Sequence, residues 1–300
     1  MANDRNDFLP EVRNSAWWAS DSRQAANGNA GAVVLQKIGL AEPPDLSEVE
    51  AVQMGHVMQP IIGRLAQDKL GIELKEADYA LTHPTESWLK SHFDFISADG
   101  NTLVEVKNYS AMVRSKFDVE SLLVPPADMA QLIHEAAVHN VTDIALAVLF
   151  GGQNLEVFRF TITEQQKEEL IKDMAKFWAC VQTKTPLEPT STFETKLIYR
   201  ESAPTSITAP ASVENAVSAL RTIKDQIKAL EEKEEQLTAV IQGFMGVNSE
   251  LVTFDSKVLA TWKSSKPSKK FDSKLFQASM PETYDKFLVE TPGSRRFLVK

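Results

Sequence analysis

Apolar positions follow two periods along this chain, one of two residues that is typical of strands and one near 3.6 residues that is typical of helices. Residues 143–150 are almost wholly apolar, as expected of a central strand covered on both faces. Residues 127–139 carry apolar side chains on one helical face, at Met129, Leu132, Ile133 and Ala136. Shorter strands are expected at residues 79–83 and 155–160. Strands that alternate with helices predict an α/β core over residues 1–185.

End signals and apolar spacing predict two more helices in this core. Residues 45–70 are expected to be helical, with Pro60 producing either a kink or two separate helices. The apolar stripe of this segment is expected at Val49, Val57, Ile61, Leu65 and Leu70. A Thr-x-x-Gln capping box at Thr163 opens a second helix that runs to about residue 182.

The stretch from Ser91 to Ser110 alternates apolar and polar residues and predicts a two-stranded hairpin. Residues 92–96 and 103–107 are the expected strands. Residues 98–101 supply the turn, because Asp, Gly and Asn tolerate positive φ. The apolar face is expected to hold Phe93, Phe95, Val104 and Val106, and the opposite face Asp94, Glu105 and Lys107.

The charged face of this hairpin is the main candidate for chemistry. Two carboxylates beside one amine can hold Mg²⁺ and activate water against a phosphodiester. The spacing from Asp94 to Glu105 and Lys107, Asp-x10-Glu-x-Lys, resembles the signature of the PD-(D/E)XK nuclease superfamily. The alternative interpretation is a solvated hairpin face with a surface ion pair, which would contribute little to stability.

The C-terminal third of the chain has a different organisation. Residues 186–210 are rich in Pro, Thr and Ser and are expected to be a linker or an extended arm. Residues 211–245 predict a long helix whose apolar residues follow a 3-4 spacing that only Glu234 interrupts. This seam fits either a coiled-coil contact between subunits or a helix packed along its own domain. Residues 250–300 are expected to form a small α+β basic module, with strands at 258–263 and 296–300 and helix between them.

Composition excludes several classes of protein. The chain has 300 residues with 43% apolar content, enough for one large domain and an appendage. No run of about 18 apolar residues occurs, so no membrane span is expected. The first fifteen residues lack an apolar signal core, so a cytoplasmic location is expected. Cys180 is the only cysteine, which excludes internal disulfides, four-Cys zinc sites and Cys-ligated iron–sulfur clusters.

Charge is unevenly distributed along the chain. The net charge of −9 argues against indiscriminate binding to polyanions. Residues 257–300 nevertheless hold ten basic and four acidic groups, so this tail is positive and the remainder strongly negative. A basic tail on an acidic body is either a DNA-contacting surface or a solubilising end.

Several sequence features occur in one order along the chain. They are Gly55-His56-Val57-Met58-Gln59-Pro60-Ile61-Ile62, Asp94, Glu105-Val106-Lys107, Ala130-Gln131-Leu132-Ile133-His134 and Phe177-Trp178 before Pro186. This order resembles the YqaJ-type viral recombinase family, the lambda-exonuclease-like branch of the PD-(D/E)XK nucleases. The tail from Ala260 to Phe297 is similar to the C-terminal segment of many phage members. The resemblance covers about residues 15–185 and 255–300.

The resemblance implies a restriction-endonuclease-like mixed sheet flanked by helices, in an Mg²⁺-dependent exonuclease that resects double-stranded DNA ends 5′→3′ for phage recombination. Mn²⁺ would substitute for Mg²⁺. Family members often form homo-oligomeric rings and work with a single-strand annealing protein. Carried onto this chain, Asp94 and Glu105 would bind the metal with help from the Val106 carbonyl. Lys107 would orient or deprotonate the attacking water, and Gln131 would help to position the site.

Further side chains are predicted to contact DNA or its phosphates: Ser20, Ser22, Arg23, Arg114, Lys263, Arg295 and Arg296. The first four are candidates for gripping a 5′-phosphate, because the planar fork of Arg matches phosphate oxygens. The alternative for these four is ordinary surface polarity.

One position departs from the family pattern, which usually has Glu where Gln59 stands. Gln is neutral and a poorer ligand for a hard cation. Either a second metal is weakly held, or one of three nearby acids replaces the missing ligand, or the protein is catalytically slow; the acids are Glu50, Glu73 and Glu76. Our hypothesis is that one metal site, formed by Asp94 and Glu105, suffices. His92 stands two residues before Asp94 and would reach the site from the same strand face, although a structural role is the alternative for all five histidines.

Three alternatives to an exonuclease stay open at this point. The same core could serve a structure-specific or restriction-like endonuclease. Gln59 keeps a second alternative open, a DNA-binding recombination scaffold whose nuclease site has decayed. A purely oligomeric structural protein would rest on the long heptad-patterned helix alone and would leave the charged hairpin unexplained.

Overall fold

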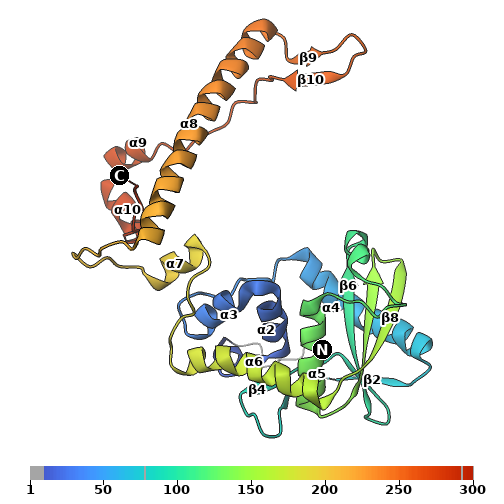
Figure 1. The fold of residues 1–300 in the computed structure, drawn as a ribbon. Coiled ribbons are helices and arrows are strands. Elements are labelled where there is room, and N and C mark those ends of the chain that lie inside the picture. Colours follow the sequence, from blue (N-terminus) through green and yellow to red (C-terminus); the bar gives the residue numbers. More distant parts are fainter. Residues whose placement is uncertain (1–9, 78, 292, 300) are drawn as a thin grey trace. The chain divides into compact units, whose positions relative to one another are not determined.

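The computed structural model describes residues 10–77, 79–291 and 293–299, and the chain divides into two units, Met1–Arg200 and Glu201–Lys300 (Figure 1). The first nine residues of the predicted core and Lys300 of the predicted last strand lie outside the described residues. The first unit is a mixed sheet flanked by helices, so the predicted α/β class is confirmed. In the part of the chain that the structure describes, no helix combines the length and the hydrophobicity needed to cross a bilayer.

The central sheet has five strands in the order β2-β5-β6-β7-β8. They are β2 (Leu74–Glu76), β5 (Phe95–Ser97), β6 (Thr102–Tyr109), β7 (Asp143–Phe150) and β8 (Asn154–Thr161). β6 and β7 run parallel, and the other neighbours are antiparallel. The parallel pair requires a crossover, which the chain makes through helix α5 (Pro126–His139). The predicted strands at residues 143–150 and 155–160 and the predicted helix at 127–139 are confirmed.

The central strand β7 is covered on both faces, as its continuous apolar sequence predicts. Its side chains alternate between two core clusters. Ile144, Leu146 and Val148 pack with Leu132 and Ala136 of α5. Ala145, Ala147 and Leu149 pack with Ile62 and Ala66 of α4 (Glu50–Leu70). The sheet is therefore sandwiched between α5 and α4 (Figure 1).

Helix α4 differs from its prediction in its extent and in its buried face. It begins at Glu50 and continues through Pro60 as one helix to the left-handed cap at Gly71. Pro60 is exposed, so water can satisfy the carbonyl group that lacks its helical partner. The predicted apolar stripe is wrong in four of its five positions: Val49, Val57, Ile61 and Leu65 are 40–58% exposed.

The face of α4 that is buried carries smaller residues than the predicted stripe. Ile62, Gly63, Ala66 and Leu70 are its buried residues. A Cβ atom at position 63 would lie 2.2 Å from the ring of Phe95. The helix packs this closely on the sheet only because position 63 is glycine.

The hairpin forms as β5 and β6, joined by a turn in which Gly100 has φ 79°. The first strand is shorter than predicted, because residues 92–94 lie outside β5. As a consequence Phe93 packs in the α5-side cluster and Phe95 in the α4-side cluster, so the prediction that they share one face is wrong. The charged face is not solvated either, since Glu105 is only 5% exposed beneath α5.

The remaining elements of the first unit build a third cluster beside α5. It contains Trp17, Leu89 and Met174. The elements are α1 (Pro10–Asn14), β1 (Trp17–Trp18), α2 (Ala19–Gln24), a π-helical turn (Ala25–Asn29), α3 (Ala30–Lys37), β3 (Leu81–Thr82), β4 (Leu89–Ser91), a 3₁₀ turn (Ala111–Lys116), α6 (Glu164–Gln182) and α7 (Thr192–Ile198). β1, β4 and β3 form a small sheet in that order, and β3 is shorter than the strand predicted at residues 79–83.

In this region the predicted helix cap is present, and the predicted linker contains a helix. The capping box at Thr163 is confirmed: its Oγ1 accepts the Gln166 N–H at 3.2 Å, and its own N–H donates to Gln166 Oε1 at 2.9 Å. The segment expected to be a linker instead contains α7. Glu194 of α7 is buried and accepts the Thr190 N–H at 2.7 Å, so this segment packs within the first unit.

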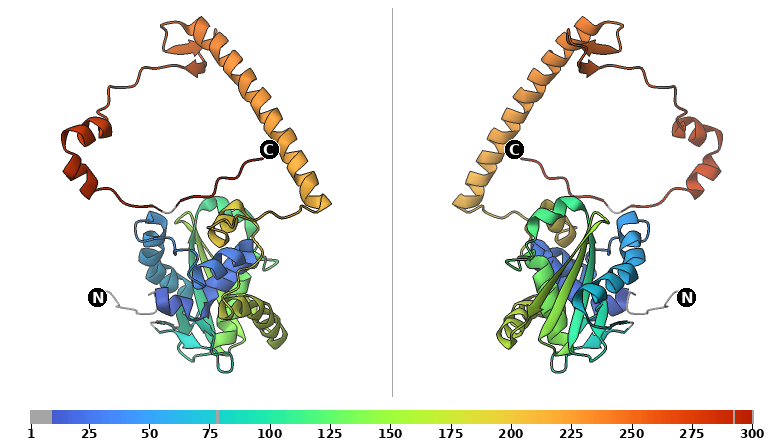
Figure 2. Two further views of the ribbon diagram at one scale, coloured as in Figure 1. Left: turned by 90° about the vertical axis from the view of Figure 1, so that its left-hand side faces the viewer. Right: turned by 90° about the vertical axis from the view of Figure 1, so that its right-hand side faces the viewer.

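The second unit consists of a long helix and small elements that bury little. They are α8 (Ala211–Met245), β9 (Glu250–Val252), β10 (Val258–Thr261), α9 (Ser273–Ser279) and α10 (Pro281–Lys286). β10 pairs antiparallel with β9, and residues 293–299 contain no strand, so the strand predicted at 296–300 is absent from its described part. Among the described residues of the second unit, no other helix or strand lies along α8 in either view of Figure 2. Of the described residues in this unit, only Met245 is buried.

Candidate active site

The candidate site lies where β6 extends past its neighbour β5. β5 has three residues and β6 has eight, so the second half of β6 has a free edge on that side. Asp94 precedes β5 at this edge, and its Oδ2 accepts the Val106 N–H at 2.8 Å. The N–H and C=O of one strand residue point to the same side. The Val106 carbonyl therefore also faces the open edge, beside the Asp94 carboxylate.

Glu105 and Lys107 stand on the same face of β6, where α5 covers them. Lys107 Nζ donates to Glu105 Oε1 at 2.5 Å, and Gln131 Nε2 of α5 donates to the same oxygen at 2.6 Å. The Lys107 side chain is 21% exposed and Glu105 is buried. Glu105 is thus held from two sides, while the Lys107 side chain keeps partial access to solvent.

The electrostatics of the site reflect two acids that are close together and poorly solvated. Burial raises the pKa of Asp94 well above its usual range, and the nearby Glu105 carboxylate raises it further. Burial lowers the pKa of Lys107, but Glu105 and Asp94 raise it by more, so it lies above its ordinary value. The two acids therefore favour additional positive charge beside them, and Lys107 supplies one such charge.

A cavity of about 340 Å³ opens onto these groups. Asp94, Glu105, Val106 and Lys107 line it from the sheet, and Gln59 lines it from α4. The structure therefore brings together the predicted carboxylates, the predicted lysine and the residue that departs from the family pattern. Gln131 does not line the cavity, but its amide group donates a hydrogen bond to Glu105.

Glu135 joins this group, and the sequence analysis missed it. It follows Gln131 by one helical turn, and its Oε1 accepts a hydrogen bond from Gln131 Nε2 at 2.8 Å. It is fully buried, and its Oε2 has no hydrogen-bond partner among the described residues. Burial, and then the charge of Glu105, raise the pKa of Glu135 well above its usual range. The i, i+4 spacing on the inner face of α5 was the signal that could have revealed it.

The donor atoms at the open edge fit one hard divalent cation. Mg²⁺ is typically held by one or two carboxylates and keeps several waters, and Asp94, Glu105 and the Val106 carbonyl provide such a set. Among the described residues, no group of three or more His, Cys, Asp or Glu side chains is arranged to hold a metal ion. The acids expected to replace Gln59 do not line the cavity: Glu50, Glu73 and Glu76.

The four predicted 5′-phosphate contacts have different environments. Ser22 is fully buried, where it accepts the Trp17 indole N–H at 3.1 Å and contacts His134 Nδ1 at 2.8 Å, so it is not accessible to a phosphate. Ser20 is exposed and accepts a hydrogen bond from Arg13. Arg114 pairs with Glu156 at 2.6 Å.

Arg23 is the best placed of these four side chains. It is 37% exposed, pairs with Asp128 at 2.8 Å and donates to the Tyr109 hydroxyl at 2.9 Å. Tyr109 follows Lys107 by two residues on β6, so both side chains leave the same face of the sheet. Burial and the Asp128 carboxylate raise the pKa of Tyr109 to about 12, so its hydroxyl stays a donor at neutral pH.

The histidines take no part in the cavity apart from His56, which lines it from α4. His92 stacks on Trp18 with ring centroids 5.1 Å apart and does not line the cavity. His134 is buried, and its ring nitrogens contact Ser22 and the Lys90 carbonyl. Burial lowers the pKa of His134 to about 3, so this ring is neutral and structural.

The predicted DNA contacts of the second unit lie on exposed segments. Lys263 follows β10 and pairs with Glu250 at 2.5 Å. Arg295 and Arg296 are exposed in residues 293–299. Their role in DNA contact stays a prediction.

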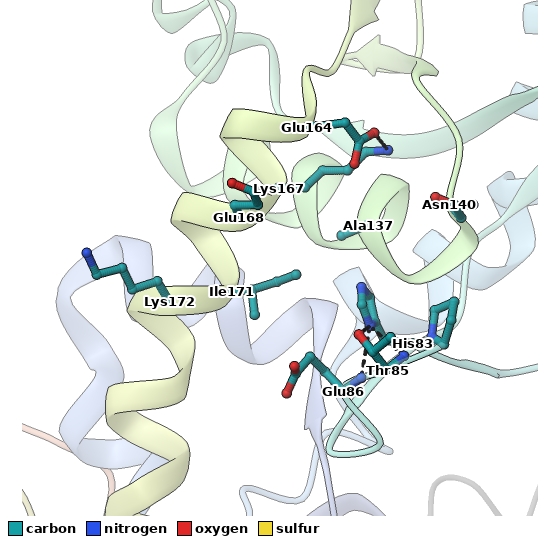
Figure 3. Close-up of a pocket in the computed structure, with 11 residues that line it drawn as sticks. His83, Thr85, Glu86, Ala137, Asn140, Glu164, Lys167, Glu168, Ile171 and Lys172 are labelled. Atoms are coloured by element: carbon teal, nitrogen blue, oxygen red, sulfur yellow. Dashed lines mark hydrogen bonds and ion pairs between the residues drawn. The ribbon is translucent and has the colours of Figure 1, made fainter.

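A larger cavity of about 480 Å³ lies elsewhere on the first unit, between α6 and the end of α5 (Figure 3). Two of its polar side chains are engaged with protein groups. Lys167 pairs with Glu164 at 2.7 Å, and His83 Nδ1 accepts the Glu86 N–H at 3.0 Å. The smaller cavity, which Asp94, Glu105 and Lys107 line together, is the better candidate for chemistry.

Comparisons with known proteins give matches at the level of structure only. No family model matches the sequence, and the search of curated proteins found no relative. An alkaline exonuclease from Laribacter hongkongensis matches at 13% identity with a TM-score of 0.49, over 58% of this chain and 92% of that one. The same exonuclease in complex with dAMP matches with the same identity and score, over 60% and 93%. A phage-related exonuclease from Haemophilus somnus matches at 10% identity with a TM-score of 0.44, over 64% and 99%. The case for a function of this chain therefore rests on its own cavity.

Proposed function

We propose that the protein is an Mg²⁺-dependent nuclease that hydrolyses double-stranded DNA from 5′ ends. The observation that carries this proposal is the open edge of β6. There two poorly solvated carboxylates, Asp94 and Glu105, meet a backbone carbonyl and the amine of Lys107 in one cavity. Two crowded acids destabilise each other unless a cation binds, and a cation beside a lysine is suited to phosphodiester hydrolysis.

The roles of the side chains follow from their contacts. Asp94, Glu105 and the Val106 carbonyl would hold the metal, which when bound polarises a phosphoryl oxygen and lowers the pKa of a water molecule. Lys107 is protonated and donates hydrogen bonds, so it orients the attacking oxygen and offsets negative charge that develops on the phosphate. Gln131 uses its amide group to keep Glu105 in place, and Glu135 accepts the second hydrogen bond of that group.

Arg23 is our candidate for recognition of the DNA end. Its guanidinium is held by Asp128 and Tyr109 on the face of the sheet that carries Lys107, yet it remains partly exposed. A planar guanidinium fixed in this way is suited to bind the oxygens of a terminal phosphate. An end-binding group on the same face of the sheet as Lys107 favours exonuclease over endonuclease activity.

The experiment uses three substrates: a linear duplex with a labelled 5′-phosphate, the same duplex with a 5′-hydroxyl, and a closed circle. Each is incubated with Mg²⁺, with Mn²⁺ or with EDTA. We expect progressive loss of the 5′ strand only with metal, faster digestion of the phosphorylated end, and an intact circle. Cutting of the circle would instead establish an endonuclease on the same core.

Gln59 supports a second candidate function, a DNA-binding scaffold that has lost catalysis. The side chain lines the cavity from α4, where an amide binds a hard cation less well than a carboxylate. This candidate predicts salt-dependent DNA binding without cleavage at any Mg²⁺ or Mn²⁺ concentration. The digestion assay together with a DNA-binding titration distinguishes the two candidates, because only the scaffold would bind DNA without cleaving it.

The finer parts of the proposal rest on the sequence resemblance. They are a role in phage recombination, a cytoplasmic location, a ring-shaped homo-oligomer and a single-strand annealing protein as partner. A ring would encircle the duplex and give processivity by topology. Its test is the particle mass at working concentration, and a strictly monomeric particle would contradict it.

A further inference from the structure

Helix α8 of the second unit exposes an apolar stripe along its whole length. Of its 35 residues only Met245 is buried. Six large apolar side chains of the stripe are 41–78% exposed: Ile223, Ile227, Leu230, Leu237, Ile241 and Phe244. A stripe of this size on a single helix is typical of an interaction surface.

The spacing of the stripe residues indicates which kind of structural element can pack against them. From Val213 to Phe244 the stripe residues are separated alternately by three and four positions, with Glu234 the one polar member. This period of 3.5 residues produces the seam of a left-handed coiled coil. The matching surface is another long helix with the same repeat, and a second copy of this chain provides one of equal length.

Glu234 decides between two orientations of such a pair. In a parallel pair in register, Glu234 would face Glu234 of the second copy within the apolar seam, which places like charges together in a dry layer. In an antiparallel pair that overlays the stripe end to end, with Val213 opposite Phe244, Glu234 instead faces Ile223 of the second copy and lies beside its Lys224. The seam therefore disfavours the parallel arrangement.

The residues that flank the seam favour the same choice. In the antiparallel overlay, Lys224 of each copy faces Glu231 of the other, which gives two ion pairs across the seam. In the parallel arrangement, Lys224 would face Ala219 and Glu231 would face Gln226, and no flanking ion pair would form. Charges at these flanking positions set the orientation of coiled-coil partners.

Side-chain sizes also match in the antiparallel overlay. The large Phe244 falls opposite Val213, and Ile241 falls opposite the small Ala216. Leucines meet leucines farther in, and Ile227 meets Leu230 at the centre. A large residue opposite a small one at both ends keeps the separation of the two helices even along the seam.

We propose that a second copy of this chain covers α8 and that the two helices form an antiparallel coiled coil. The contact is isologous, so it is complete with two chains, and any larger ring needs a further surface.

Crosslinking tests the orientation in the full-length chain. Cys180→Ser removes the only cysteine, and Ala216→Cys and Ile241→Cys are then made as separate single-cysteine chains. A short bismaleimide is added to each chain alone and to the two chains after they have been mixed and allowed to exchange. We expect a crosslinked dimer only in the mixture. Crosslinking of either chain alone would show a parallel pair and overturn the proposal, as would the absence of crosslinking in all three samples.

Charge reversal on the otherwise unchanged chain tests the flanking pairs. We expect Lys224→Glu or Glu231→Lys to raise the dimer dissociation constant by roughly tenfold, since two attractive exposed pairs become repulsive, and the double variant to restore it. Lys228→Glu, on the outer side of α8, is the matched control and should leave the constant unchanged. A wild-type chain that sediments as a monomer at all concentrations, or single variants that behave like the control, would overturn the proposal.

Discussion

The two units of this chain use apolar side chains in opposite ways. In the first unit Leu146, Ile144 and Phe158 are almost completely enclosed, and the sheet is covered on both faces. In the second unit side chains of similar size, such as Leu230 and Phe244, remain more than half exposed. The difference shows that the first unit buries its apolar residues among its own elements, whereas the elements of the second unit leave large apolar side chains of α8 uncovered.

The two units also differ in the environment of their acidic side chains. Burial in the first unit places Asp94, Glu105 and Glu135 in an environment where their charges interact strongly. The acids of α8 are exposed to water, where charge interactions are weak. The proposed hydrolysis therefore belongs to the first unit and the proposed association to the second.

The largest expected difference concerns matched truncations of two leucines. Leu146→Ala should lower the free energy of unfolding of the first unit by about 2–5 kcal/mol, because it leaves a cavity in a closed core. Leu230→Ala should leave that unfolding unchanged to within about 0.5 kcal/mol. Tryptophan fluorescence during denaturation is a suitable measure, because Trp17, Trp88 and Trp178 pack in the third cluster of the first unit. Similar decreases in the free energy of unfolding from both substitutions would contradict this difference between the two units.

A smaller effect is expected from Glu135→Gln. In the unfolded chain Glu135 titrates near its ordinary pKa of 4.5, whereas the folded chain keeps the proton to higher pH. The folded state therefore binds more protons in this window, and its free energy of unfolding falls as pH rises. The E135Q variant does not titrate, so its free energy of unfolding should gain on that of wild type as the pH rises above about 4.5.

The measurement for this variant is denaturation across pH in EDTA, so that bound cations do not contribute. Glu214→Gln, an exposed acid on the outer side of α8, is the matched control and should follow wild type. If the free energy of unfolding of E135Q depends on pH in the same way as that of wild type, burial does not raise the pKa of Glu135.

The smallest effect is expected from Gln59→Glu. If one metal held by Asp94 and Glu105 suffices, a third acid in the cavity should change the cleavage rate at limiting Mg²⁺ by less than about threefold. Gln53→Glu adds the same charge to α4 outside the cavity and is the control. A many-fold gain from Q59E alone would show that a second metal limits the reaction and would end the single-metal hypothesis.

Local patterns were sufficient to predict the parts of the fold that depend on local chemistry. The apolar run of β7, the inner face of α5 and the capping box at Thr163 occur where the pattern indicates. Asp94, Glu105 and Lys107 could be predicted as neighbours because a tight turn fixes the register of the two strands.

Other features depend on contacts between distant segments and could not be predicted in this way. Ser22 reads as a surface residue, yet it is buried against His134, 112 positions later in the chain. Phe93 and Phe95 alternate as if in one strand, but β5 begins only at Phe95, so they enter different clusters. The exposed stripe of α4 misleads in the same way, because close packing against Phe95 requires Gly63 on the buried face.

The most direct test of the account is single-turnover digestion of a 5′-labelled duplex by wild type, Lys107→Ala and Lys116→Ala. Lys116 is exposed outside the cavity, so its variant controls for the loss of one positive charge. We predict cleavage by wild type and K116A only with Mg²⁺, and a loss of about 10²–10³-fold in K107A, the size found when one charge-stabilising donor is removed. K107A should stay folded under the assay conditions. Cleavage by K107A at the wild-type rate, or wild-type cleavage that persists in EDTA, would contradict the assignment of hydrolysis to this cavity.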